Sequence, residues 1–203
     1  MLYFITLRFI VIVLKVFFRI EINGKENIPQ QGAFILACNH TSYFDPPILA
    51  AGCFHRRLNF LAKDELFRNW AFGWYIRRLG AFPIRREGRD ISAVKESIRR
   101  IRKGQPLVIF PEGGRSNDGI LKEGLPGIAL LATREQIPVV PAFIKGANAV
   151  LRTASKSLPL RKICVGFGAP LFFNANDYAS YGEIADKIMD AIKCVACHLD
   201  DTR

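Results

Sequence analysis

Several features that identify particular protein classes are scarce or missing in this 203-residue sequence. Its five cysteines are odd in number and irregularly spaced, which excludes the paired framework of a disulfide-rich secreted domain and fits a reducing compartment better. No G-x-S-x-G turn offers a serine nucleophile, and there is no internal repeat, low-complexity tract or clear domain boundary. The length therefore indicates one globular domain with a substantial core.

Acidic residues are also scarce. The sequence has 18 Asp and Glu but 29 Lys and Arg, which gives a formal net charge of +11. A chain this basic is expected to meet nucleic acid, an anionic lipid surface or a phosphorylated substrate. The cations are scattered in pairs, without zinc-finger spacing, a Gly/Arg-rich segment or an aromatic RNA-binding motif. Charge alone therefore selects no partner.

The first twenty residues are apolar but lack the uninterrupted run of a membrane span. Arg8, Lys15 and Arg19 share one narrow face of a helix that turns about 100° per residue. A cation at mid-bilayer costs about 2.5–3.5 kcal/mol, and a helix lying in the interface avoids that cost. A signal peptide fits poorly, since Lys15 interrupts its apolar region and no A-x-A-like site follows. We interpret residues 1–22 as an amphipathic monotopic anchor and 23–203 as the remaining domain, with a soluble helix covering the core as the alternative.

The C-terminal segment contains "CVACH" at 194–198, which has the C-x-x-C-H form of c-type haem attachment. Apolar residues recur around it at helical spacing, from Ile184 to Leu199. A helix that packs on the core explains the same cysteines, so we expect no haem.

Short apolar runs alternate with helical patterns through the rest of the chain. Six runs predict strands, at 33–38, 58–62, 80–84, 107–110, 139–144 and 163–168. Helical patterns between and after them lie at 65–79, 91–101, 125–136 and in the C-terminal segment. The alternation predicts a single α/β domain with a largely parallel mixed sheet flanked by helices.

Polar segments follow three of the predicted strands, where ligand sites gather in such sheets. The first, "NHTSYFD", sets His40 five positions before Asp45. A neutral imidazole can take a proton from a hydroxyl if its other nitrogen donates to a carboxylate. The alternative is a capping Asp45 before Pro46 and Pro47 start a helix. The spacing alone does not decide between them.

The other two strand exits are "RREGR" at 85–89 and "PEGGRS" at 111–116. A Gly-rich turn after a strand exposes backbone N–H groups to anions, and the guanidinium of Arg115 is a planar fork suited to phosphate. The alternatives are a plain turn, with Glu112 and Arg115 paired in solvent, and ordinary surface charge at 85–89.

Four blocks in this order resemble those of the glycerolipid acyltransferases, in particular the bacterial 1-acylglycerol-3-phosphate acyltransferases. They are "NHTSYFD" (39–45), "GAFPIRR" (80–86), "FPEGGRS" (110–116) and "IPVVPAF" (137–143). "LAKDELF" (61–67) is similar to the family's intervening segment, and the resemblance covers nearly the whole chain from about residue 20.

The resemblance implies that His40 is the general base and Asp45 its orienting partner, while Pro138 shapes the pocket. It also implies a set of acceptor-binding residues, with the arginines on the phosphate: Arg86, Glu112, Gly113 and Arg115. One departure is that Gly114 replaces the Thr that is common in the third block. This loss of a hydroxyl bears on the choice of acceptor rather than on the chemistry.

The reaction that the resemblance implies is transfer of an acyl group from acyl-CoA or acyl carrier protein to the sn-2 hydroxyl of 1-acylglycerol-3-phosphate. The product is phosphatidate, and the process is phospholipid biosynthesis. No cofactor or metal is expected, because a thiol leaves readily. The expected partners are the bilayer, a lysophospholipid acceptor and an acyl thioester donor, with no nucleic acid, at the cytoplasmic face of a bacterial inner membrane.

Three alternatives stay open on the sequence. The first keeps the chemistry and changes the acceptor to glycerol-3-phosphate or another lysolipid. The second is a non-enzymatic basic protein that binds membrane or nucleic acid. The third is a metal-dependent hydrolase with His40, Asp45 and Glu112 as ligands.

Overall fold

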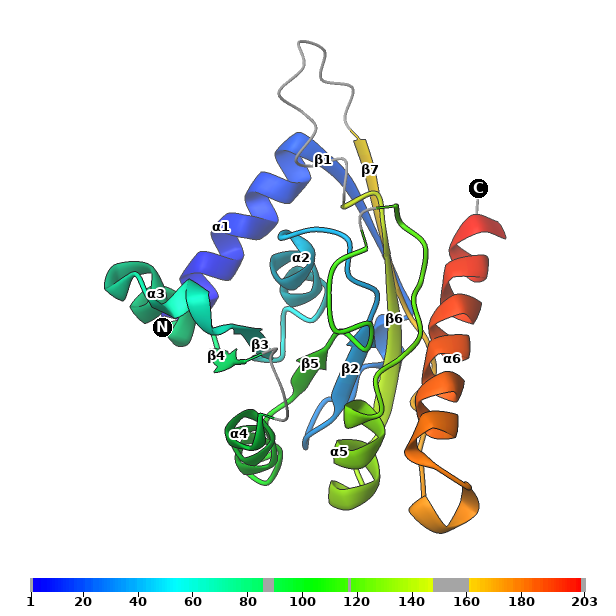
Figure 1. The fold of residues 1–203 in the computed structure, drawn as a ribbon. Helices are drawn as coiled ribbons and strands as arrows, with labels where there is room; N and C mark the ends of the chain where they lie inside the picture. Colours follow the sequence, from blue (N-terminus) through cyan, green and yellow to red (C-terminus); the bar gives the residue numbers. More distant parts are fainter. Residues whose placement is uncertain (1, 86–89, 117, 148–160, 202–203) are drawn as a thin grey trace.

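The computed structural model describes residues 2–85, 90–116, 118–147 and 161–201, which form a seven-stranded sheet (Figure 1). The strand order is β1-β7-β6-β2-β5-β3-β4. Neighbouring strands are parallel except β6 and β7, which are antiparallel. The strands are β1 Phe18–Asn23, β2 Ile35–Cys38, β3 Asn59–Lys63, β4 Ala81–Ile84, β5 Leu107–Ile109, β6 Val139–Lys145 and β7 Arg161–Phe167. The predicted α/β domain with a largely parallel mixed sheet is confirmed.

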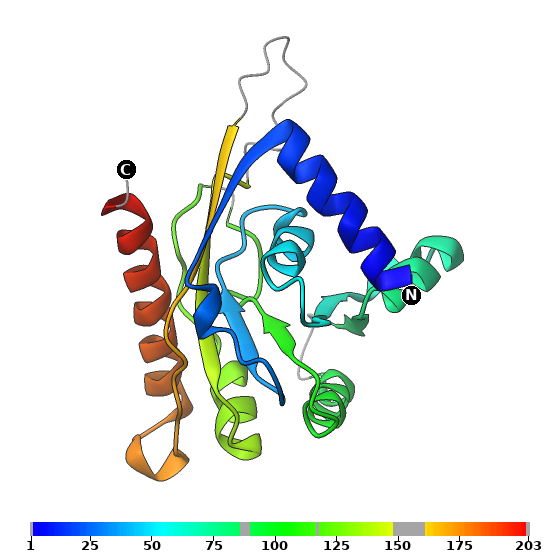
Figure 2. The ribbon, with the colours of Figure 1, turned by 180° about the vertical axis from the view of Figure 1, so that it is seen from behind.

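Helices cover both faces of this sheet. The α-helices are α1 Leu2–Phe17, α2 Asp45–Gly52, α3 Trp70–Arg78, α4 Ile91–Ile101, α5 Gly127–Glu135 and α6 Tyr181–Asp201. Helices α1 and α2 pack with one core on one face, and α4, α5 and α6 with a second core on the other (Figures 1 and 2). Short 3₁₀ turns lie at Lys25–Asn27, Asp64–Phe67 and Ala175–Asp177.

Strand β2 lies between the two cores and carries the first block on its carboxyl end. Leu36 and Cys38 belong to the core on the α1 face, whereas Ile35 and Ala37 belong to the opposite core. All four residues are buried because side chains alternate between the faces of a strand. A strand buried on both faces gives the loop that follows it a rigid support.

The N-terminal segment is divided differently from the sequence prediction. The expected helix of about twenty residues ends at Phe17, and β1 pairs in parallel with β7. Phe18, Ile20 and Ile22 pack against the core, whereas Glu21 turns away from it and forms an ion pair with Lys162 at 2.7 Å. This period of two is a strand pattern. The boundary placed after residue 22 is therefore corrected, because β1 belongs to the sheet.

The aromatic helix expected over 65–79 is in fact a 3₁₀ turn followed by α3. Asn69 separates the two, since its side-chain oxygen accepts a hydrogen bond from the amide of Phe72 at 3.0 Å. Asn is a favoured N-cap residue for this reason. Helix α3 lies beside the N-terminal end of α1 (Figures 1 and 2), where the hydroxyls of Tyr75 and Thr6 are 3.4 Å apart.

Asp90 connects the exit of β4 to the start of α4. Its carboxylate accepts the amide of Arg85 at 2.7 Å and the amide of Ala93, the N-cap bond of the helix, at 3.0 Å. The bond from Arg85, with those from Ser92 and Ala93, lowers the pKa of Asp90 to about 2. The ionised carboxylate is therefore the form that the folded chain favours.

We expect Asp90→Ala to lower the free energy of unfolding by about 0.5–2 kcal/mol at neutral pH, which is the usual cost of losing an N-cap. A depressed folded-state pKa contributes stability above the ordinary Asp value, and this contribution is lost as the pH falls through about 2. Urea unfolding of both proteins from pH 7 downward checks this. A deficit that does not shrink on acidification contradicts the role given to the charge, and Asp90→Asn, which keeps the acceptor oxygen, is the matched control.

Candidate active site

His40 and Asp45 meet directly beyond β2. Nδ1 of His40 lies 2.8 Å from Oδ2 of Asp45, and Asp45 is completely buried whereas the imidazole is 13% exposed. A carboxylate only accepts hydrogen bonds, so Nδ1 carries the hydrogen and Nε2 is the basic nitrogen. The arrangement suits proton abstraction by Nε2, with a carboxylate that orients the ring and stabilises the imidazolium.

The same carboxylate oxygen also shapes the turn between β2 and α2. Oδ2 accepts the amides of Thr41 at 2.7 Å and Ser42 at 2.8 Å, in addition to the imidazole. Asp45 is the first residue of α2 but does not cap it, since the N-cap position falls on Phe44. The helix-cap alternative is therefore wrong, and Asp45 orients His40.

An aromatic ring that the sequence reading did not single out holds the other side of the imidazole. Phe110 follows β5, and its ring stacks on His40 with centroids 4.0 Å apart and planes at 15°. The hydrogen bond to Asp45 and this stacking restrict the imidazole in two different directions. The sequence feature that could have pointed to Phe110 is its position as the first residue of the block "FPEGGRS".

The loop after β5 also clamps the backbone of His40. Glu112 Oε1 accepts the amide of His40 at 2.9 Å, and the amide of Ser116 donates to the carbonyl of His40 at 2.7 Å. Glu112 Oε2 accepts the amide of Lys122 at 3.2 Å. Both carboxylate oxygens of Glu112 are thus engaged within the loop, and its expected contact with an acceptor stays a prediction.

Asn39 ties the catalytic loop to the opposite neighbour of β2 and was also missed. Its buried amide donates to the carbonyl of Ile144 in β6 at 3.0 Å and accepts the amide of Ile144 at 2.8 Å. The sequence signal was a polar residue at the end of an apolar strand. His40 is therefore held between β5 and β6.

Arg115 lies at the same strand exit and stacks on Tyr43 of the first block. The guanidinium carbon is 3.6 Å from the ring centroid, and Nη2 donates to the Tyr43 hydroxyl at 2.8 Å. Across the described ranges no carboxylate lies within ion-pair distance of Arg115, so the alternative of a plain turn with Glu112 and Arg115 paired is not what the structure shows. An oriented cation without a counter-ion is suited to an anionic ligand.

Gly113 has a backbone conformation that explains the first glycine of the third block. Its φ is +67°, and a Cβ at this position would lie 2.5 Å from Cδ1 of Leu125. Glycine therefore allows the sharp turn that brings Glu112 back to His40.

Two other predicted positions, Arg86 and Pro138, are not seen beside His40 in the described part of the chain. Arg86 lies outside the described residues, and Arg85 is exposed at the end of the edge strand β4, which β3 separates from β5. Pro138 precedes β6, and its carbonyl accepts the amide of Ile35 at 2.9 Å. This is the amino end of β2, so the expectation that Pro138 shapes the pocket around His40 is corrected.

The site contains a thiol, but the thiol is not poised to react. Burial raises the pKa of Cys38 well above its ordinary value, and the nearby charges of Asp45 and Glu112 raise it further. A neutral buried thiol is a poor nucleophile. Cys38 is therefore not a candidate nucleophile.

Comparisons with known proteins identify the family of this chain. The family model described as Acyltransferase matches residues 19–145. The chain is 32% identical over 130 residues to the 1-acyl-sn-glycerol-3-phosphate acyltransferase of Bacillus subtilis, covering 64% of each chain. It is 32% identical over 151 residues to the enzyme of the same name from Streptococcus pneumoniae, covering 73% of this chain and 54% of that one. The matches thus span less than two thirds of the relatives' own lengths.

A third relative and a crystal structure match the chain as well. The lyso-ornithine lipid O-acyltransferase of Rhodobacter capsulatus is 38% identical over 104 residues, covering 50% of this chain and 35% of that one. The crystal structure of the 1-acyl-sn-glycerophosphate acyltransferase PlsC from Thermotoga maritima matches with a TM-score of 0.74 and 27% identity. That match covers 94% of this chain and 78% of the other.

Proposed function

This chain belongs to the acyltransferase family, and we propose that it acylates the sn-2 hydroxyl of 1-acylglycerol-3-phosphate from an acyl thioester, forming phosphatidate for phospholipid biosynthesis. The observation that carries the proposal is the imidazole of His40, which is fixed at Nδ1 by a buried carboxylate at 2.8 Å and has Nε2 as its basic nitrogen. The names of the bacterial relatives support the choice of acceptor.

The proposed reaction is a single displacement through a tetrahedral intermediate. Nε2 of His40 takes the hydroxyl proton while the acceptor oxygen bonds to the thioester carbonyl carbon. Collapse of the intermediate breaks the carbon–sulfur bond, and the imidazolium returns the proton to the departing thiolate. Asp45 stabilises the imidazolium, and backbone N–H groups around Gly113 and Gly114 are proposed to bind the oxyanion.

Phosphate recognition is assigned to arginine. Arg115 is oriented on Tyr43 at the strand exit that carries His40, and Arg86 joins it in the proposal. A bidentate guanidinium on the acceptor phosphate would place the free hydroxyl in a defined position relative to Nε2. Gly113 contributes the turn that closes the loop, and Glu112 keeps that loop on His40.

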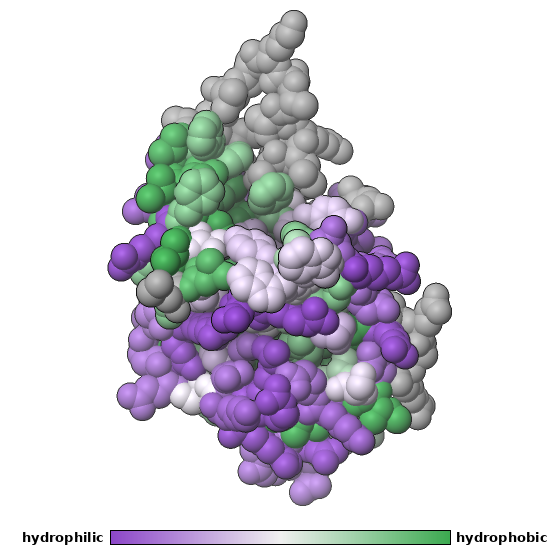
Figure 3. Space-filling model, turned by 90° about the vertical axis from the view of Figure 1, so that its left-hand side faces the viewer, coloured by the Kyte–Doolittle hydropathy of each residue, from purple (hydrophilic) through white to green (hydrophobic). Residues whose placement is uncertain are grey.

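The membrane is the proposed location of this reaction, with the chain on the cytoplasmic face of a bacterial inner membrane. Tyr3, Leu7 and Leu14 of α1 are buried, but the opposite side of α1 is apolar and exposed. The exposed apolar residues of α1 and α3 are Phe4, Ile5, Phe9, Ile12, Val16, Phe17, Trp70, Phe72 and Trp74. They form a continuous apolar and aromatic patch (Figure 3), and such a patch marks an interaction surface.

The charges around this patch favour a helix that lies in the interface. Arg8 and Lys15 are exposed at its border, where they can meet lipid phosphates. Within the described ranges, no helix combines the length and apolarity needed to cross a bilayer. The alternative of a soluble helix accounts for the buried side of α1 but leaves its exposed apolar side unexplained.

The alternatives from the sequence differ in what supports them. A lysolipid acceptor other than 1-acylglycerol-3-phosphate is favoured by the relative named for lyso-ornithine lipid and by Gly114 in place of Thr. Metal ligation by His40, Asp45 and Glu112 would compete with hydrogen bonds that those residues already make. We propose a reaction without metal or other cofactor, with acyl-CoA or acyl carrier protein as donor.

We expect His40→Ala to reduce acyl transfer by about a hundred- to ten-thousandfold, because general-base catalysis contributes about 10²–10⁴. Asp45→Asn should retain more activity than His40→Ala, since the imidazole remains. Turnover of labelled acyl thioester by purified protein measures both. The matched control is His55→Ala, an exposed histidine, and wild-type turnover by His40→Ala contradicts the assignment.

Arg115→Ala is expected to lower kcat/KM about ten- to a hundredfold for an acceptor that carries a phosphate, because a charge-assisted hydrogen bond contributes about 1.5–3 kcal/mol. The loss should be much smaller for an otherwise identical acceptor without phosphate. Arg134→Ala, an exposed arginine of α5, is the control. Equal losses on the two acceptors would show that Arg115 supports the loop or the donor instead.

We expect the double variant Phe9→Gln/Ile12→Gln to bind vesicles more weakly and to lose activity on bilayer-embedded acceptor, while activity on a short-chain soluble acceptor is retained. This double substitution tests the exposed patch more specifically than a deletion of the first twenty residues, because the deletion would also remove core residues and part of β1. Ile120→Gln/Phe172→Gln changes equally exposed apolar residues elsewhere and serves as the control. An N-terminal tag found across the bilayer from the domain would overturn the in-plane arrangement.

A further inference from the structure

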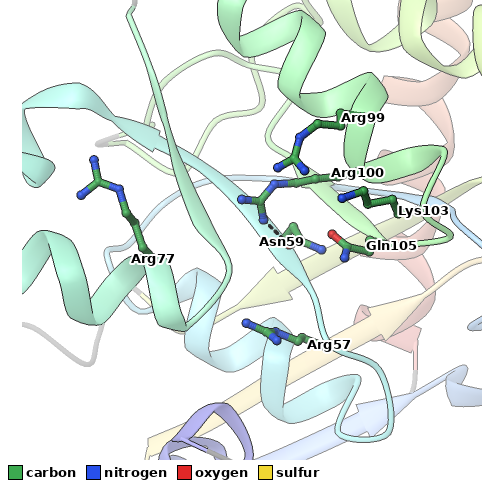
Figure 4. Close-up of a pocket in the computed structure, with 7 residues that line it drawn as sticks. All are labelled: Arg57, Asn59, Arg77, Arg99, Arg100, Lys103 and Gln105. Atoms are coloured by element: carbon green, nitrogen blue, oxygen red, sulfur yellow. Dashed lines mark hydrogen bonds between the residues drawn. The ribbon is translucent and has the colours of Figure 1, made fainter.

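A second concentration of positive charge lies away from the catalytic histidine. It surrounds a hollow of about 210 Å³ (Figure 4). The lining residues are Arg57, Asn59, Arg77, Arg99, Arg100, Lys103 and Gln105. Five of these seven are cations and none is acidic, so the hollow is suited to an anion.

This hollow is at the amino ends of β3 and β5, whereas His40 lies beyond the carboxyl end of β2. Asn59 is the first residue of β3, and Gln105 precedes β5 by two positions. Both strands run parallel to β2, whose carboxyl end carries His40. Since four strand residues span about 13 Å, the hollow is separate from the site at the strand exits.

The hollow is assembled from segments that are distant in sequence. Arg99 and Arg100 come from α4, Arg77 from α3, and Arg57 from the loop before β3 (Figure 4). Arg100 donates to Oδ1 of Asn59 and, at 3.1 Å, to the carbonyl of Gly80. Arg57 donates to the carbonyl of Arg78 at 3.0 Å. These contacts with neutral acceptors orient the guanidinium groups without neutralising them.

One carboxylate is shared by two of the cations. Glu96 pairs with Arg99 at 2.6 Å and with Arg100 at 2.7 Å, and the hydrogen bond from Arg99 is the largest cause that lowers the pKa of Glu96 to about 2. In the described part of the chain, Arg57, Arg77 and Lys103 pair with no carboxylate. Among the described residues, three of the five cations of the hollow thus have no paired carboxylate, and the other two share Glu96.

A simpler explanation applies to part of the cluster. Helices α3 and α4 both end near the hollow, and cations in the last turn of a helix interact favourably with its dipole. That account covers Arg77, Arg99 and Arg100. It does not explain Arg57, which lies in a loop, or why all of them line one hollow.

The hollow adjoins the apolar patch of α1 and α3. Arg77 is in α3, the helix that exposes Trp70 and Trp74. The guanidinium of Arg57 lies 5.5 Å from the ring of Tyr3, on the buried side of the first turn of α1. In Figure 3 a hydrophilic zone lies next to the aromatic part of the patch. If the patch enters the acyl boundary, these cations are at the level of the lipid head groups.

We propose that this hollow binds the phosphate group of an anionic membrane lipid, at a site distinct from the acceptor site. The volume is below the roughly 300–1,000 Å³ of pockets that enclose whole drug-sized ligands, so the hollow accommodates a head group while the acyl chains stay in the bilayer. Arginine forks match phosphate oxygens. The inference rests on the membrane docking proposed above, and it gives the domain a second contact that fixes its orientation on the bilayer.

The test compares Arg99→Gln/Lys103→Gln with the charge-matched control Arg134→Gln/Lys193→Gln, which removes two exposed cations from α5 and α6. Both changes in the hollow are at exposed positions, so the fold should be retained. Binding of the full chain is measured on vesicles of equimolar phosphatidylcholine and phosphatidylglycerol, and on phosphatidylcholine alone. We expect the hollow variant to bind the anionic vesicles about thirtyfold more weakly than the control, from about 1 kcal/mol per cation. Equal binding by the two variants would overturn the site, since net charge alone would then be sufficient.

Two further arms identify the source of the phosphate and separate this proposal from the proposed reaction. Soluble dioctanoyl phosphatidylglycerol should compete with anionic vesicles for wild-type protein more strongly than inorganic phosphate at equal ionic strength, and should lose this advantage on the hollow variant. Stronger competition by inorganic phosphate would assign the hollow to a free anion and overturn the lipid assignment.

Vesicle binding needs no turnover, so a lack of acyl transfer would leave this result standing. Turnover of short-chain soluble acceptor should be equal in the two variants, and a selective loss in the hollow variant would place the hollow in the catalytic machinery instead.

Discussion

The buried carboxylate of Asp45 is the group on which the arrangement of the active site depends. One oxygen accepts the imidazole of His40 and the amides of Thr41 and Ser42. These bonds give a buried carboxylate oxygen three donors in the interior, where an unpaired polar group would be costly. They also determine the path of the chain from β2 to α2, so the loop conformation and the orientation of the base have the same physical cause.

The parallel pairing of β2 with β5 and β6 extends this control to the other blocks. Because β5 is hydrogen-bonded to β2, the loop after it reaches the backbone of His40 through Glu112 and Ser116. Asn39 makes the corresponding connection to β6 through Ile144. Side chains placed by rigid strands keep their geometry better than those on free loops, as catalysis requires.

The positive charge of the chain serves different surfaces. Arg115 is at the strand exits beside the acid–base pair, whereas the cationic hollow is at the amino ends of β3 and β5, next to the helix α3 that carries part of the apolar patch. Helix α1 contributes to both the core and the apolar patch, since one of its sides is buried and the other is exposed and apolar. A net charge of +11 is thus distributed over an acceptor site and a membrane-facing surface in the functions proposed for them.

The sequence by itself determined six of the seven strands and the α/β class, because these depend on local periodicity. The five-residue separation of His40 and Asp45 left a helix cap open, and their pairing was predicted from the resemblance of four ordered blocks. Tertiary structure decided the features that join distant segments. Strand β1 exists because Phe18–Asn23 pairs with a strand more than 130 residues away, and the same residues read locally as the end of a helix. Phe110 stacks on His40 and Glu112 binds its backbone only because β5 lies beside β2. The cations of the hollow converge for the same reason: local patterns specify elements, whereas the packing of those elements specifies which side chains meet.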